Sequence, residues 1–141
     1  MKISPLVLFS IFFVVSYCYD YDTNEGIIIL NDTNFDIALD YYDHLLVNFD
    51  KGCKWCRIFR PYYLGAYNES LIENMNVTYA QLDLNTNLLI KERYEIEHHP
   101  TQLLFVKSDP YSPYRFTRTK NKDKLLAWLR ETLAYIEEKG Y

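Results

Sequence analysis

The sequence predicts an α/β fold with a central mixed β-sheet flanked by helices. Two observations carry this prediction. Short apolar runs typical of buried strands alternate along the chain with segments of helical periodicity. The last segment, residues 122–139, repeats apolar residues at helical spacing after two successive expected strands. The predicted order is β-α-β-α-β-α-β-β-α, in a single domain within a chain of 141 residues.

Each element follows from its local residues. The expected strands cover residues 27–30, 45–49, 77–84 and 103–106, and the expected helices cover residues 35–42, 53–74, 88–94 and 122–139. Thr33 or Asn34 can cap the first helix, and Pro61 removes one backbone donor inside the second and bends it. Residues 109–113 contain two prolines and predict a turn-rich connection, after which Phe116 and its neighbours form a fifth strand. The residues before the first strand form a short acidic leader.

Residues 1–18 predict a cleaved secretory signal peptide. Lys2 provides a basic start, residues 3–17 are almost wholly apolar, and Cys18 precedes a suitable cleavage site. The apolar run is short for a membrane span, and an uncleaved interfacial anchor is the alternative. The expected mature domain covers residues 19–141. Loss of Lys2 with the signal peptide changes the net charge from −4 to −5. The sequence has no stripe of basic residues of the kind that would indicate nucleic-acid binding.

Three N-x-S/T triplets follow this segment, at Asn31, Asn68 and Asn76. They predict a glycoprotein of a secretory compartment. Residues 137–141 are not a retrieval signal of the Lys-Asp-Glu-Leu type. The expected location is therefore the endoplasmic reticulum lumen or the exterior of the cell, with the mode of any retention open.

Signal cleavage leaves Cys53 and Cys56 as the only cysteines, in a CxxC motif. A pair so close in sequence closes almost no loop, so a redox role fits better than a stabilising one. The helix N-terminus favours the thiolate of Cys53, which makes Cys53 the attacking residue and Cys56 the resolving residue. Lys54 and Arg57 add positive charge, and Trp55 adds apolar surface beside the sulfurs.

Two other uses of the cysteine pair stay open. His44, His98 and His99 could join the cysteines in a zinc site, although adjacent histidines match the usual ligand spacing poorly. A disulfide without a substrate is the second alternative. We expect neither a metal nor an organic cofactor.

Several landmarks stand at characteristic distances from the motif. A buried strand over residues 45–49 leads into it, and Pro61 follows its second cysteine by five residues. Asp83 lies seventeen residues before Pro100, with Tyr94 between them. This spacing resembles that of the thioredoxin superfamily, and most of all the catalytic domains of protein disulfide isomerases. The resemblance implies a thioredoxin fold.

The resemblance also implies roles for residues 99–101. Their sequence is similar to the family's cis-proline segment, so Pro100 is expected to be cis and to pack against the motif. The backbone beside Pro100 and Thr101 would then pair with an extended substrate strand. His99 has two open interpretations: an imidazole that tunes the redox pair, or a surface residue that faces the substrate.

The sequence departs from the family at four places around the motif. Gly52 replaces the usual tryptophan before the first cysteine, and the loop from Phe49 to Cys53 is one residue shorter than in the family. Asn48, or Val47 if the gap is placed elsewhere, replaces the buried acid that relays protons. Asp50 could substitute for that acid, although a solvated loop carboxylate is the more favoured interpretation. Residues 54 and 55 replace the Gly-His dipeptide that isomerases favour.

A fifth departure lies before the last helix. Lys120 stands in the register of the family's mobile arginine, with Arg118 two residues earlier. Lys120 would keep the charge but lose the planar fork of arginine.

Together these features predict a thiol-disulfide oxidoreductase or isomerase, a monomer that contributes to protein folding in the secretory pathway. Its expected partners are unfolded or disulfide-bonded client proteins and a thiol/disulfide recycling partner. The protein itself is expected to have no stable membrane span. The alternative is a thioredoxin-fold chaperone or binding module with little redox turnover.

Overall fold

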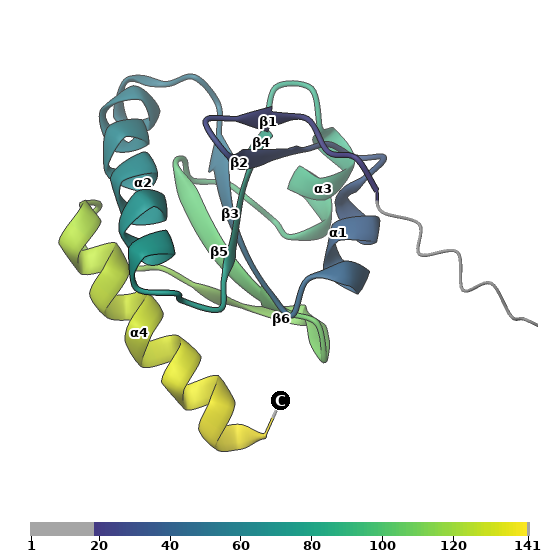
Figure 1. Ribbon diagram of the computed structural model, residues 1–141. Helices are drawn as coiled ribbons and strands as arrows, with labels where there is room; N and C mark the ends of the chain where they lie inside the picture. Colours follow the sequence, from purple (N-terminus) through teal and green to yellow (C-terminus); the bar gives the residue numbers. More distant parts are fainter. Residues whose placement is uncertain (1–18, 141) are drawn as a thin grey trace, which may run out of the picture.

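A computed structural model describes residues 19–140 of the chain (Figure 1). The expected signal peptide, residues 1–18, lies outside the described residues. The elements in chain order are β1 (Thr23–Asn24), β2 (Ile27–Leu30), α1 (Phe35–Tyr41), β3 (His44–Asp50), α2 (Lys54–Ile72), β4 (Thr78–Asp83), α3 (Leu88–Arg93), β5 (Thr101–Val106), β6 (Asp109–Arg115) and α4 (Lys122–Lys139).

The strands form one mixed sheet in the order β1-β2-β4-β3-β5-β6. The central strand β3 runs parallel to β4 and antiparallel to β5. Its carboxyl end leads through two residues to Cys53, the N-cap of α2. A strand in the middle of the sheet therefore positions the CxxC motif.

Two helices cover each face of the sheet, α1 and α3 on one side and α2 and α4 on the other (Figure 1). Side chains along β3 point alternately to the two faces of the sheet, so this strand contributes to the apolar core on each face. Leu45, Val47 and Phe49 pack with the residues of α1 and α3, whereas Leu46 packs with those of α2 and α4. Asn48 shares the face of Leu46, so it lies on the α2 side. The predicted fold class is confirmed.

A fully buried tyrosine of the long helix α2 is hydrogen-bonded to the sheet. The hydroxyl group of Tyr63 donates to the carbonyl oxygen of Ala80 on β4 at 2.6 Å, with the carbonyl oxygen of Leu46 on β3 at 3.1 Å. Pro61 lies inside the helix as expected. Among residues 19–140, no helix combines the length and apolar character needed to cross a membrane.

The expected fifth strand is present, but its bounds were wrong, and strand β1 at the other edge was not predicted. Residues 109–113 belong to strand β6 rather than to a turn, and Phe116 follows that strand as a buried residue. An edge strand tolerates Pro110 and Pro113 because it has one side without hydrogen-bonded neighbours. At the other edge, the expected acidic leader contains strand β1, which pairs with β2.

Candidate redox site

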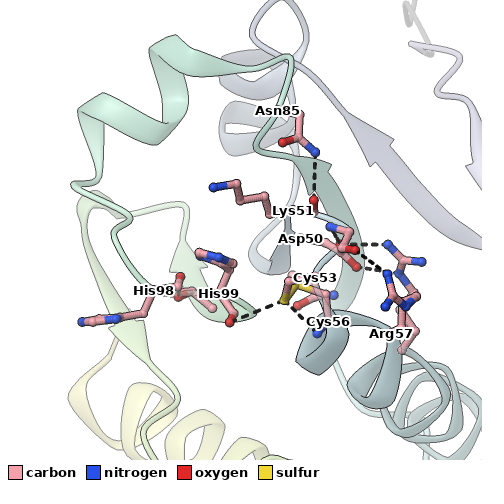
Figure 2. Close-up of a disulfide and its surroundings, with 12 residues drawn as sticks. Asp50, Lys51, Cys53, Cys56, Arg57, Asn85, His98 and His99 are labelled. Atoms are coloured by element: carbon pink, nitrogen blue, oxygen red, sulfur yellow. Dashed lines mark hydrogen bonds and ion pairs between the residues drawn. A yellow bond between two sulfur atoms is a disulfide. The ribbon is translucent and has the colours of Figure 1, made fainter.

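Cys53 and Cys56 form a disulfide at the N-terminus of α2 (Figure 2). The backbone N–H of Cys56 donates to Cys53 Sγ at 3.0 Å, so the sulfur caps the helix. Cys56 is fully buried, whereas Cys53 is partly exposed. An external thiol can therefore reach the first sulfur more easily than the second.

The connection before Cys53 is held by Asp50, whose side chain is only 13% exposed. Arg60 Nε and Nη2 donate to its two carboxylate oxygens at 2.6 and 2.8 Å, and the backbone N–H of Gly52 donates to Oδ1 at 2.6 Å. Burial alone would raise the pKa of Asp50, but the hydrogen bonds from Arg60 and Gly52 outweigh it and lower the pKa. The interpretation of Asp50 as a solvated loop carboxylate was wrong, and its paired, ionised state also makes it a poor proton carrier near neutral pH.

Gly52 has a φ of 77°, in the left-handed region. A Cβ atom there would meet nothing within 4 Å, so the backbone conformation and not crowding favours glycine. The family's tryptophan at this place would be strained in this conformation. The backbone conformation therefore favours the glycine that replaces it.

Basic and aromatic residues lie next to the two cysteines in the first turn of α2. Arg57 Nη1 donates to the carbonyl oxygen of Gly52 at 2.9 Å, which ties α2 to the preceding turn. Lys54 Nζ lies 5.8 Å from the centre of the Trp55 ring. Both Lys54 and Trp55 are exposed.

The segment around Pro100 faces the disulfide from the opposite side. The His99–Pro100 peptide bond is cis, as the family resemblance implied. The carbonyl oxygen of His99 lies 3.9 Å from Cys53 Sγ, and Figure 2 shows this oxygen pointing toward the sulfur. Pro100 and Thr101 are buried, and the Thr101 hydroxyl donates to the carbonyl oxygen of His98. His99 therefore contacts Cys53 through its backbone carbonyl group.

Asn48 belongs to a buried polar network that the sequence did not predict. Its Oδ1 atom accepts from Gln102 Nε2 at 2.8 Å, and both residues are almost completely buried. Gln102 Oε1 in turn accepts from Lys120 Nζ. Because Val47 faces the other core, Asn48 is the residue on the α2 side of the sheet. The signal in the sequence that could have indicated this network is Gln102, a polar residue near the start of the mainly apolar strand β5.

Lys120 is held inward by this network. Burial lowers its pKa to about 8, and the nearby charge of Arg115 adds to the effect. Arg118 points elsewhere, into an ion pair with Glu131 on α4. The structure therefore separates the two candidates for the family's arginine position, and Lys120 is the one inside the fold.

Of the three histidines considered for a zinc site, His44 lies away from the cysteines. His44 begins β3, at the end away from the motif, where its Nδ1 atom lies 2.8 Å from the carbonyl oxygen of Asn76. Within residues 19–140, no three His, Cys, Asp or Glu side chains are placed to hold a metal ion.

The three expected glycosylation residues are exposed. Asn31 and Asn76 lie outside the helices and strands, whereas Asn68 lies within α2. In the triplet of Asn68, Ser70 is buried and hydrogen-bonded to Tyr79.

Comparison with known proteins agrees with this arrangement. Residues 26–131, most of the chain, match the thioredoxin family. The chain belongs to the thioredoxin family. The first thioredoxin domain of mouse protein disulfide-isomerase A4 superposes with a TM-score of 0.70 at 20% identity, covering 79% of each chain. This likeness confirms the thioredoxin fold.

Curated relatives of this thioredoxin-family chain include protein disulfide isomerases. Protein disulfide-isomerase of Gallus gallus is 25% identical over 111 residues, which is 78% of this chain and 22% of the relative. A probable protein disulfide-isomerase A4 of Caenorhabditis elegans is 27% identical over 111 residues, 78% of this chain and 17% of the relative. The chain thus spans about a fifth of the length of these relatives.

Proposed function

We propose that this protein is a thiol-disulfide oxidoreductase that exchanges disulfides with cysteine-containing client proteins through Cys53 and Cys56. The observation that carries this proposal is the unequal exposure of two disulfide-bonded cysteines at one helix N-terminus, where Cys53 is partly exposed and Cys56 is buried. An incoming thiolate reaches Cys53, and Cys56 stays close enough to resolve the mixed disulfide.

The exchange balances in two steps. A client thiolate attacks Cys53 Sγ, forms a mixed disulfide and releases the thiolate of Cys56. A second client thiolate attacks the client sulfur of that bond, forms the client disulfide and releases the thiolate of Cys53. The client loses two electrons, the pair gains them, and protons from the client thiols are taken up by solvent or by the released thiolates. The reverse sequence reduces a client, and a thiol/disulfide recycling partner restores the pair.

Supporting roles are proposed from the contacts of the site. Lys54 and Arg57 favour the thiolate through their charge, and Trp55 presents apolar surface to the client. Pro100 and Thr101 shape the client cleft through the backbone beside them, because their own side chains are buried. His99 acts through the carbonyl oxygen beside Cys53. Lys120 influences the pair only through the network of Gln102 and Asn48.

A secretory compartment, the endoplasmic reticulum lumen or the exterior, is proposed as the site of action. The apolar residues 3–17, the exposed Asn31, Asn68 and Asn76, and the isomerase relatives support it. Expression in secretory cells, with endoglycosidase treatment of single Asn→Gln variants, tests both entry and occupancy. A chain that is never glycosylated and stays in the cytosol would contradict this location.

The activity is tested with insulin reduction and with reactivation of scrambled ribonuclease. Wild type is expected to turn over, and Cys53→Ala and Cys56→Ala are each expected to lose turnover. Cys56→Ala should also accumulate a mixed disulfide with the client, because the resolving thiol is absent. Wild-type activity no higher than that of either variant would refute the proposal.

A thioredoxin-fold chaperone or binding module is the second candidate. The observation that favours it is the amide of Asn48 at a position where the family carries an acid. In this case the pair would exchange once with a client without sustained turnover, and suppression of client aggregation would persist in Cys53→Ala.

A further inference from the structure

An exposed apolar stripe runs along α2 and begins beside the disulfide. It consists of Trp55, Ile58 and Tyr62, which are 66%, 43% and 43% exposed. Residues at i, i+3 and i+7 share one face of a helix. With a rise of about 1.5 Å per residue, the stripe extends about 10 Å from the dipeptide between the cysteines.

This stripe is separate from the face of α2 that builds the core. Phe59, Tyr63 and Ala66 already fill the space against the sheet and α4. Single exposed apolar residues are ordinary on protein surfaces, whereas several on one face indicate an interaction site. The position of the stripe beside Cys53 makes it continuous with the redox site.

The stripe ends at a hollow between α2 and the start of α4. Its volume is about 660 Å³, and its lining consists of Pro61, Tyr62, Asn121, Lys122, Asp123 and Lys124. A stripe that leads from the disulfide to a hollow fits an extended segment that passes along the helix.

Basic side chains outnumber acidic ones at the border of the stripe, where the hollow contributes Asp123 as well as Lys122 and Lys124. Lys54, Arg57 and Lys124 form no ion pair with any side chain among residues 19–140. The whole chain nevertheless has a net charge of −4. Unpaired positive charge beside an apolar surface favours an occupant that carries acidic residues.

We infer that Trp55, Ile58 and Tyr62 form a docking surface for an extended, acidic client segment with apolar side chains close to its reacting cysteine. An extended chain advances about 3.3 Å per residue, so these side chains lie within about three residues of that cysteine. The inference rests on the proposed function, because continuity with the disulfide identifies a client as the occupant.

The test uses two short peptides, each containing one cysteine in a disulfide with glutathione and two flanking glutamates. The apolar probe has leucine and phenylalanine within three residues of the cysteine, and the matched probe has serines there. Stopped-flow measurement follows their reaction with the reduced protein. Wild type is expected to prefer the apolar probe about tenfold, which corresponds to about 1.4 kcal/mol.

The double variant Ile58→Ser/Tyr62→Ser is expected to reduce this preference to below about twofold. Leu71→Ser/Ile72→Ser is the matched control, since both residues are exposed at the far end of α2, and it should retain the wild-type preference. Replacement of the glutamates in the apolar probe by lysines should slow its reaction, and 1 M salt should remove that difference.

Three results would overturn the docking surface: no preference in wild type, an unchanged preference in Ile58→Ser/Tyr62→Ser, or an equal loss in the control. Failure of the proposed function gives a different result, with neither probe reacting with wild type. Calorimetric titration with an apolar probe carrying serine for cysteine then decides the inference. Binding by wild type that is lost in Ile58→Ser/Tyr62→Ser supports the surface, and no binding by wild type overturns it.

Discussion

Lys120 shows how partial burial changes the acid–base chemistry of a residue. Its ammonium group donates to Gln102 Oε1 and, at 3.3 Å, to the carbonyl oxygen of Phe116, but neither acceptor carries a charge. Hydrogen bonds to neutral groups do not repay the loss of water around an ammonium ion. Burial therefore lowers the pKa of Lys120 to about 8.

Stability should depend on pH through this lysine. Between about pH 8 and its ordinary pKa of 10.5, the unfolded chain holds a proton that the folded protein has released. The free energy of unfolding therefore rises with pH across this window, and the destabilisation from the partly buried charge is largest below pH 8. Lys120→Met should remove this slope. Urea unfolding of both proteins at pH 7.5, 8.5 and 9.5 measures it, and parallel pH curves would contradict the prediction.

At the scale of an element, α2 combines the redox pair with the charge that favours its thiolate. The helix begins after Cys53, whose sulfur accepts the N–H of Cys56, and its first turn contains Lys54 and no acidic residue. Asp50 binds Arg60 in the second turn and so fixes the approach of the chain from β3. The positive end of the helix and the geometry of the turn thus act on the same sulfur.

Reversal of the charge at Lys54 should slow the reaction of Cys53. In the reduced protein, Lys54→Glu places a negative charge beside the sulfur and reduces the fraction of thiolate, so alkylation by iodoacetamide at pH 6 should slow about threefold or more. Lys107→Glu, in the turn between β5 and β6, changes the net charge equally and should react like wild type. Equal rates for the two variants would mean that the local charge does not act on Cys53.

At the scale of the whole molecule, stability comes from two apolar layers on the faces of one sheet. Phe35 is fully buried on the α1 and α3 side, where its ring packs against Phe49, Tyr94 and Phe105. The disulfide joins residues only three apart in sequence and restricts the unfolded chain little.

Removal of the disulfide should therefore cost less than a cavity in either layer. Cys53→Ser/Cys56→Ser is expected to stay folded and to lose at most about 2 kcal/mol, the loop-entropy value for so short a closure. Phe35→Ala should lose about 3–5 kcal/mol, because its aromatic neighbours cannot fill the space. Chemical denaturation measures both. A larger loss in the cysteine variant would show that the disulfide is a structural staple.

The local sequence pattern was sufficient to predict the helices and strands whose formation is favoured by their own residues. Apolar runs predicted β2 to β5, helical spacing predicted α1 to α4, and these ends agree with the structure to within two residues. The predicted bounds of β6 were wrong because prolines indicate a turn in isolation, whereas an edge strand accepts them. Strand β1 was missed because two exposed polar residues become a strand only by pairing with β2.

The sequence by itself determined the fold class, the family and the cysteine pair, because periodicity and motif spacing are local properties of the chain. Only the tertiary structure decided how the surrounding polar groups are used. Asn48, Gln102 and Lys120 are far apart in sequence and meet because β3, β5 and the start of α4 converge. Burial, pairing and pKa depend on such distant neighbours. The structure therefore makes Asp50 an ion-pair partner and makes Lys120 a partly buried ammonium group with a lowered pKa.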